Sequence, residues 1–266
     1  YIARLLENIA RTGNPYGAET IDTALSAEIA SLDPGAKTLL FLGADARYKV
    51  PETAISAIRL LRASGTVFTV LAQEPDSGAA LYTLAGAAEE TREAMAAAAQ
   101  QLSAFEKVIA LDPADASVFL REYRAWDVPL SASVQTFTAF AAELVASGAL
   151  RMKKSVRRIA VQDPAALARD LEETVPLRDI ASSCGEVREM LLHGRQTVFA
   201  GSLLMNEWMP EVMALTAQLR WRSALAADAE VLIAASPAEY ALLRDTQPPA
   251  VRVLPVQALM LESLEG

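Results

Sequence analysis

The sequence has very few of the side chains that bind metal clusters. Its 266 residues include one cysteine, Cys184, and one histidine, His193. A single cysteine excludes an internal disulfide, and it also excludes a cysteine-ligated iron–sulfur cluster, because such clusters ordinarily need four thiolates. We therefore expect the chain to hold no iron–sulfur cluster of its own.

A long apolar run and an excess of basic residues are also missing. No stretch reaches the roughly 20 uninterrupted apolar residues of a membrane span, so we expect a soluble protein. The first residues indicate a helix and not an export signal, so we expect a cytoplasmic location. Lys and Arg number 24 against 33 Asp and Glu, which gives a formal charge of -9. Nucleic-acid binding needs clustered positive charge, so we expect no nucleic-acid partner.

What is present is an alternation of strand-like and helix-like segments, which is typical of an α/β fold with parallel sheets. Short apolar runs predict strands at 37–42, 67–71, 107–111, 158–161, 196–200 and 231–234. The same order of strand, turn and helix recurs in the second half. We predict two pseudo-repeated lobes, each a small, mostly parallel sheet flanked by helices. The predicted limits are an N-terminal helical connection at 1–35, a first lobe at 36–150 and a second lobe at 151–266.

Three turns in each half follow the predicted strands in the same order. They lie at 43–44, 74–76 and 112–115 in the first half, and at 163–165, 200–202 and 236–239 in the second. Ligands of open α/β sheets usually bind outside the carboxyl ends of the strands. We therefore expect the three turns of each half to converge.

Short motifs at these turns are similar to those of a known family. In the first half they are Phe41-Leu-Gly-Ala-Asp-Ala-Arg-Tyr48, Gln73-Glu-Pro-Asp-Ser-Gly78 and Asp112-Pro-Ala-Asp115. In the second half they are Gln162-Asp-Pro-Ala-Ala-Leu-Ala-Arg169, Phe199-Ala-Gly-Ser202 and Ser236-Pro-Ala-Glu239. The set resembles the cysteine-rich (CCG) domains of iron–sulfur oxidoreductases related to heterodisulfide reductase, with the cysteines replaced. The resemblance marks ten vestigial cluster positions: Ala44, Pro75, Asp76, Asp112, Asp115, Ala165, Phe199, Ala200, Ser236 and Glu239.

The resemblance implies a structural or docking subunit of a redox, electron-transfer complex, with no cofactor of its own. The implied partners are ferredoxin-like, flavin or quinone-reactive subunits, and any membrane association would occur through such a partner. Two alternatives stay open. One is a protein that binds a small molecule or divalent cation in the vacated pocket, lined by Arg47, Tyr48, Asp112 and Asp115. The other is a non-cofactor subunit of an active iron–sulfur oxidoreductase.

On this interpretation the chain is not catalytic alone, and we assign no catalytic, cofactor-binding or metal-binding residue. Simple structural roles explain most of the polar candidates. Asp112 and Asp115 have the spacing of residues that cap a helix beginning near Pro113. Ser183 and Glu186 have the spacing of a capping box, and we expect His193 to meet the last carbonyl groups of a helix.

Overall fold

A computed structural model describes residues 1–265, and these divide into two compact units, each described here by itself. Unit 1 comprises Tyr1–Ile58 and Thr66–Phe137, and unit 2 comprises Arg59–Gly65 and Thr138–Gly266. Both units consist of a parallel sheet with helices around it, so the predicted α/β class with two parallel sheets is confirmed. The lobe limits given above, at residues 36 and 151, stay a prediction.

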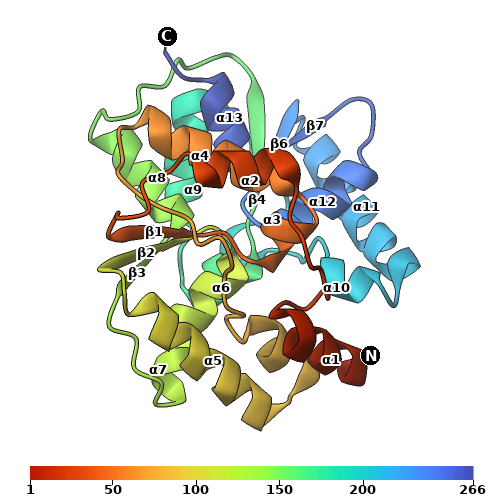
Figure 1. Ribbon diagram of the computed structural model, residues 1–266. Helices are drawn as coiled ribbons and strands as arrows, with labels where there is room; N and C mark the ends of the chain where they lie inside the picture. The colour runs from red at the N-terminus through yellow and green to blue at the C-terminus, as the bar shows by residue number, and fades with distance from the viewer. Residues whose placement is uncertain (266) are drawn as a thin grey trace. The chain divides into compact units, whose positions relative to one another are not determined.

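The sheet of unit 1 has the order β1-β2-β3, and both pairs of neighbouring strands are parallel (Figure 1). The strands are β1 (Thr38–Phe41), β2 (Lys107–Ala110) and β3 (Ser133–Thr136). The helices are α1 (Ile2–Thr12), α2 (Thr23–Ala30), α3 (Ala44–Tyr48), η1 (Leu81–Ala85), α5 (Ala88–Leu102), α6 (Pro113–Ser117), η2 (Val118–Glu122) and α7 (Tyr123–Ala125). Two helices run from unit 1 into unit 2, namely α4 (Pro51–Ala63) and α8 (Phe137–Ala146).

The sheet of unit 2 has the order β5-β4-β6-β7 and is also parallel throughout. Its strands are β4 (Arg158–Gln162), β5 (Glu186–Val187), β6 (Val231–Ala234) and β7 (Arg252–Pro255). Its helices are η3 (Ala166–Asp170), α9 (Val175–Cys184), η4 (Gly194–Gln196), α10 (Leu203–Asn206), α11 (Pro210–Ala226), α12 (Pro237–Asp245) and α13 (Val256–Glu262). Helices α9 and α13 lie on one side of this sheet, and α11 and α12 lie on the other (Figure 1).

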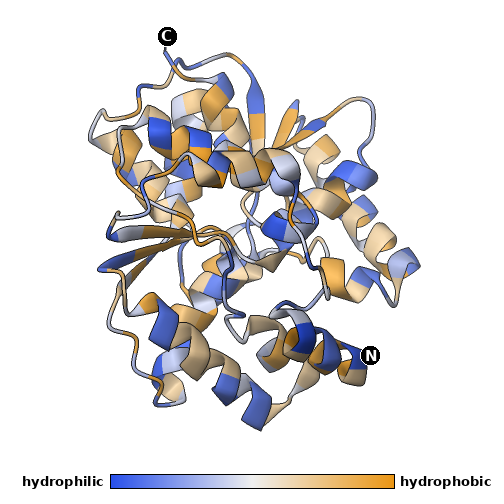
Figure 2. Ribbon diagram, viewed as in Figure 1, coloured by the Kyte–Doolittle hydropathy of each residue, from blue (hydrophilic) through white to orange (hydrophobic). Residues whose placement is uncertain are grey.

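The strands form the centre of each core. All four residues of β6 are buried, as are the last three residues of β1 and of β2. A parallel strand that is covered on both faces needs apolar side chains on both, which explains why these short runs are continuous and not alternating. Helix α11 instead carries both hydrophobic and hydrophilic residues, and only one of its faces is buried (Figure 2).

Several sequence predictions fail in the second half. Residues 196–200 form no strand, and after the short η4 they continue as an irregular loop. Ser183 is not an N-cap, because it lies near the end of α9 and its hydroxyl donates to the carbonyl of Ile180. His193 follows a non-helical segment, although its Nδ1 does lie 2.7 Å from the carbonyl oxygen of Met190.

Within residues 1–265, none of the helices combines the length and the apolar character that crossing a membrane demands.

Candidate active site

A cluster of buried polar side chains lies at the carboxyl ends of β4 and β6 in unit 2. Gln162 ends β4, and Asp163 follows it directly. Glu239 is the third residue of α12, the helix that begins just after β6, and Arg220 comes from α11. The four side chains are between 0% and 3% exposed, so every hydrogen bond they lack is costly.

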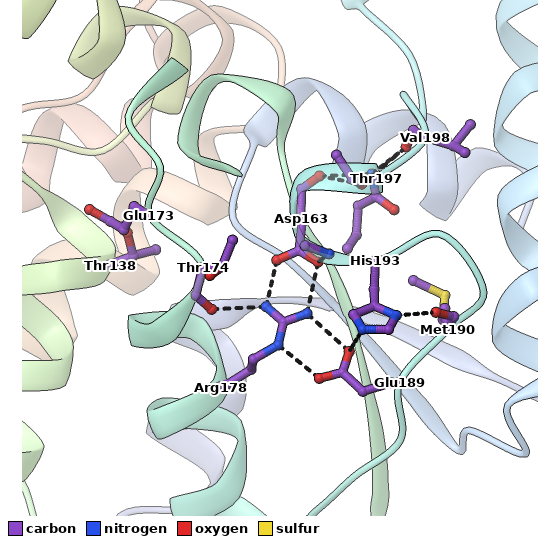
Figure 3. A network of polar contacts seen from close by, with 12 residues as sticks. Thr138, Asp163, Glu173, Thr174, Arg178, Glu189, Met190, His193, Thr197 and Val198 are labelled. Atoms are coloured by element: carbon purple, nitrogen blue, oxygen red, sulfur yellow. Dashed lines mark hydrogen bonds and ion pairs between the residues drawn. The ribbon is translucent and has the colours of Figure 1, made fainter. Parts of the chain in front are cut away.

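Asp163 is the best-satisfied carboxylate of this cluster (Figure 3). Its two oxygens accept hydrogen bonds from Arg178 at 2.7 and 3.0 Å, and Oδ2 also accepts one from the backbone amide of Gly194 at 2.6 Å. Arg178 continues to Glu189 through Nε and Nη2, at 2.8 and 2.9 Å. All polar atoms of the Asp163 carboxylate are therefore engaged, as expected for a structural role.

Glu239 is satisfied at one oxygen only. Its Oε1 accepts from the amide of Ala200 at 3.0 Å and from Nε2 of Gln162 at 3.1 Å. Its Oε2 is buried and has no hydrogen-bond partner among residues 1–265. Burial raises the pKa of Glu239 to about 7, although the hydrogen bonds from Ala200 and Gln162 and the charge of Arg220 act to lower it.

Arg220 is a buried cation with an incomplete set of partners. Its Nε donates to Oε1 of Gln162, and its Nη1 donates to the carbonyl of Leu191 at 3.1 Å. Its Nη2 finds no partner in the part of the chain that the structure describes. Burial lowers the pKa of Arg220, while the charges of Glu239 and Asp163 favour its protonated form.

Residues 188–202 lie over this cluster with almost no regular structure. Buried or partly buried side chains hold the backbone of this loop: Gln162 donates to the carbonyl of Val198 at 3.0 Å, and Arg169 donates to that of Thr197 at 2.8 Å. The hydroxyl of Thr197 in turn donates to the carbonyl of Asp163 at 2.7 Å. The loop is thus fixed by side chains from β4 and η3, and not by a strand ladder.

Unit 1 has a matching group of acidic residues at the carboxyl ends of β1 and β2. Asp112 is the N-cap of α6 and accepts from the amide of Ala114 at 2.8 Å, so its predicted capping role is confirmed, whereas Asp115 lies in the first turn. The hydroxyl of Ser77 donates to Asp115. Burial raises the pKa of Asp115 well above its ordinary value, and the charge of Asp112 raises it further. Burial also raises the pKa of Asp76, to about 6.

Glu74 and Arg47 complete this group. The two oxygens of Glu74 accept from the amides of Leu42 and Gly43 at 2.7 and 3.0 Å. Arg47 donates to two backbone carbonyls, and its Nη1 lies 3.6 Å from Oε1 of Glu74. Arg47 therefore neutralises the buried carboxylate of Glu74.

The expected convergence of turns is seen in each unit. Contacts join Gly43 to Glu74 and to Asp115 in unit 1, and they join Ala200 to Glu239 in unit 2. Asp45 accepts a hydrogen bond from the hydroxyl of Tyr16. Among the other vestigial positions, Phe199 is exposed, Ala165 is partly exposed, and Ser236 is the N-cap of α12.

Sequence reasoning assigned no role to several polar residues that the structure makes central: Glu74, Gln162, Asp163, Arg178 and Arg220. For Arg220 a signal was available. It shares the helical spacing of Met213, Ala217 and Ala224, all of which are buried in α11. A charged residue at a core position of a helix indicates a buried polar partner.

The acidic residues do not form a cation site. Across residues 1–265 there is no group of three or more His, Cys, Asp or Glu side chains that could hold a metal ion. In unit 1 the acidic residues are engaged as helix caps or bonded to backbone amides and to Ser77. The divalent-cation alternative is therefore not supported.

Comparison with known proteins gives structural neighbours only. No family model and no curated protein matches the chain. A solved structure of Picrophilus torridus aspartate racemase is similar with a TM-score of 0.40 and 10% identity, over 85% of this chain and 94% of that one. Glutamate racemase RacE1 of Bacillus anthracis gives 0.40 and 14%, over 85% and 79%. Glutamate racemase of Francisella tularensis, in complex with D-glutamate, gives 0.39 and 9%, over 86% and 79%.

These neighbours contradict the predicted membership of the heterodisulfide reductase-related CCG family, because they are racemase-type proteins. The predicted role as a scaffold in an electron-transfer complex is therefore wrong. The alternatives within that family and the predicted redox partners are wrong for the same reason. The structure explains why the motifs misled. Asp112-Pro-Ala-Asp115 and Ser236-Pro-Ala-Glu239 are helix N-termini, each with an N-cap, a first-turn proline and a first-turn acid. Any α/β fold can contain that pattern.

Proposed function

We propose that the protein is an enzyme that moves a proton to or from a small substrate, with Glu239 as the acid–base group. The observation that supports this most is the unpartnered Oε2 of a carboxyl group whose other oxygen is held by two hydrogen bonds. Buried polar atoms are nearly always hydrogen-bonded, so an orphaned oxygen in a rigid carboxyl group needs an explanation.

Comparison with other carboxylates of the same protein supports a functional explanation. Asp163 is fully buried and the side chain of Glu74 is 4% exposed, yet both oxygens of each carboxylate have partners. Their arrangement is what a purely structural carboxylate achieves. Glu239 also has a pKa raised to about 7 by burial, and a general acid or base works best when its pKa lies near the working pH.

The reaction class that fits a single acid–base carboxyl is removal and return of a proton next to a carboxylate. Glu239 in its ionised form would accept the Cα proton of the substrate, exchange it with solvent and return a proton to the carbanion. This proton exchange needs no oxidant, reductant or further reactant. Amino acids are suitable probes because they carry both groups, and aspartate and glutamate join alanine in the first panel because the neighbours named above are aspartate and glutamate racemases.

The test is solvent exchange followed by proton NMR in D2O. Wild-type protein should remove the Cα–H signal of at least one amino acid in the panel, supplied as each enantiomer. Glu239→Gln should slow that exchange by about 100-fold or more, which is the usual contribution of general acid–base catalysis. The matched control is Glu211→Gln on the exposed surface of α11, which should exchange at the wild-type rate. Equal rates for wild-type protein and Glu239→Gln, or no exchange with any probe, would contradict the proposal.

A further inference from the structure

Three side chains of unit 2 form one chain of buried hydrogen bonds: Arg220, Gln162 and Glu239. The amide of Gln162 accepts from Nε of Arg220 through its oxygen and donates to Oε1 of Glu239 through its nitrogen. Gln162 is fully buried and also bonded to the carbonyl of Val198, so its orientation is fixed. The guanidinium and the carboxyl group are therefore held at the two ends of one rigid amide.

Each end of this chain has one polar atom without a partner. At one end it is Nη2 of Arg220, and at the other it is Oε2 of Glu239. Both atoms are buried, and the Arg220 side chain as a whole is 1% exposed. A buried hydrogen-bonding atom that lacks a partner destabilises the fold, and the cost is larger in a charged group. Two such atoms in one cluster indicate that a further molecule completes it.

We infer that Nη2 of Arg220 and Oε2 of Glu239 bind the carboxylate group of a small ligand. This inference goes beyond the proposed function, since a carboxylate bound at Oε2 of protonated Glu239 occupies the proton-transfer atom and therefore competes with the substrate. An arginine with a free N–H group is suited to bind carboxylates, because the hydrogen bond is assisted by charge. A carboxylate has two oxygens, so one can accept from Arg220 and the other from the protonated Glu239.

The charges around the site favour an anion when Glu239 is protonated. The charged groups that act on Glu239 are Arg220 and Asp163, and Asp163 is itself paired with Arg178. Protonation of Glu239 thus removes the carboxylate that most strongly favours the charged form of Arg220. An ordered water could also accept from Arg220 and donate to Glu239, but a water would not respond to added carboxylate.

Formate, the smallest carboxylate, is the probe for this site. We would measure the Tm of the wild-type protein in formate and in chloride at the same ionic strength. The Tm should be higher in formate by about 2 °C or more, because a ligand that binds only the folded state stabilises it. Arg220→Met should abolish the rise. No formate-specific rise in the wild-type protein, or an equal rise in Arg220→Met, would overturn the inference and leave an ordered water as the partner.

A second measurement does not depend on whether Arg220→Met folds. Titration of the wild-type protein with carbon-13 formate should give an affinity that falls about tenfold from about pH 6 to about pH 8, as Glu239 loses its proton. Glu239→Gln, whose amide donates at any pH, should bind formate with little pH dependence. The same pH dependence in both proteins would overturn the inference. Formate binding without Cα–H exchange would contradict only the proposed function, and exchange without formate binding would contradict only this inference.

Discussion

At the scale of single residues, the hydrogen bonds of a buried carboxyl group separate a structural role from a chemical one. Asp163 has two arginine hydrogen bonds and one amide hydrogen bond, whereas Glu239 has one oxygen left over. An ion pair and amide donors favour the charged form of a carboxyl group, and burial without enough donors favours the neutral form. Burial therefore raises the pKa of Glu239 to about 7.

Glu239→Gln should remove the part of the pH dependence of the unfolding free energy that comes from this carboxyl group. The folded state holds the Glu239 proton to about pH 7, while the ordinary value of the group is 4.5. Between these values the unfolded state binds fewer protons, so stability falls as the pH rises through this window and levels off above it. The loss is on the order of 3 kcal/mol. Denaturant titrations from about pH 4.5 to about pH 8 should show a shallower fall for Glu239→Gln than for the wild-type protein and the Glu211→Gln control; equal slopes would contradict the assigned protonation.

Arg178→Met should be strongly destabilising, because it leaves Asp163 as a buried charge without its ion pair. Breaking a buried pair by removing one partner costs about 3–5 kcal/mol. The matched control is Arg195→Met, whose ion pair with Glu172 is exposed on both sides and should contribute less than about 1 kcal/mol. Urea unfolding of the two variants measures the difference, and similar losses in both would show that the Asp163 network does not stabilise the fold.

At the scale of elements, the N-termini of helices α6 and α12 share one capping pattern but differ in the charge of the N-cap residue. Both begin with a capping side chain followed by proline, but the cap is Asp112 in α6 and Ser236 in α12. Asp112 also raises the pKa of Asp115 through its charge, so the α6 cap stabilises the helix and repels a neighbour at the same time.

This difference predicts unequal effects of removing the caps. Ser236→Ala should cost about 1 kcal/mol, the usual value of an N-cap. Asp112→Ala should cost less, because loss of the cap is offset by loss of repulsion on Asp115, and Asp112→Asn should be neutral or stabilising because asparagine still caps. Thermal unfolding near neutral pH compares the three variants. A larger loss for Asp112→Ala than for Ser236→Ala would contradict this account.

Elements with a continuous apolar run were predicted correctly, and polar or short ones were not. The strands β1, β2, β4 and β6 match the predicted runs to within one or two residues. Strand β3 was missed because Ser-Val-Gln-Thr lies at the edge of its sheet with little apolar character. Residues 67–71 make only one bridge, between Leu39 and Thr69. Residues 196–200 resemble a strand in sequence, but their backbone groups form hydrogen bonds to side chains and not to a neighbouring strand. These side chains are Gln162, Arg169 and Glu239.

The candidate site was only partly predictable for a related reason. Glu239 could be placed from the sequence, because the repeat fixes it at the start of a helix after a buried strand. Arg220 and Gln162 could not be paired with it, since they come from other elements and meet only when β4, α11 and α12 pack together. That packing also decides which atoms are left without a hydrogen-bond partner, so these atoms could not be predicted from the sequence.

At the scale of the whole molecule, acidic residues with raised pKa values occur in both units. Burial raises the pKa of Asp45, Glu74, Asp76 and Asp115 in unit 1 and of Glu239 in unit 2. The formal charge of -9 adds repulsion as these groups ionise. The folded protein should therefore be most stable at mildly acidic pH and lose stability towards pH 8. Calorimetry across this range should show that Tm falls as the pH rises. A Tm that rises with pH would contradict the claim that these carboxyl groups have raised pKa values in the folded protein.

The protonation state of Glu239 can be measured directly by infrared difference spectroscopy. Infrared spectra of the wild-type protein minus those of Glu239→Gln isolate the carbonyl band of this one carboxyl group from the other buried acids. We expect a band of the protonated form that persists below neutral pH and disappears with a midpoint near 7. If the band is already lost near the ordinary pKa of a glutamate, the raised pKa that supports Glu239 as the acid–base group is contradicted.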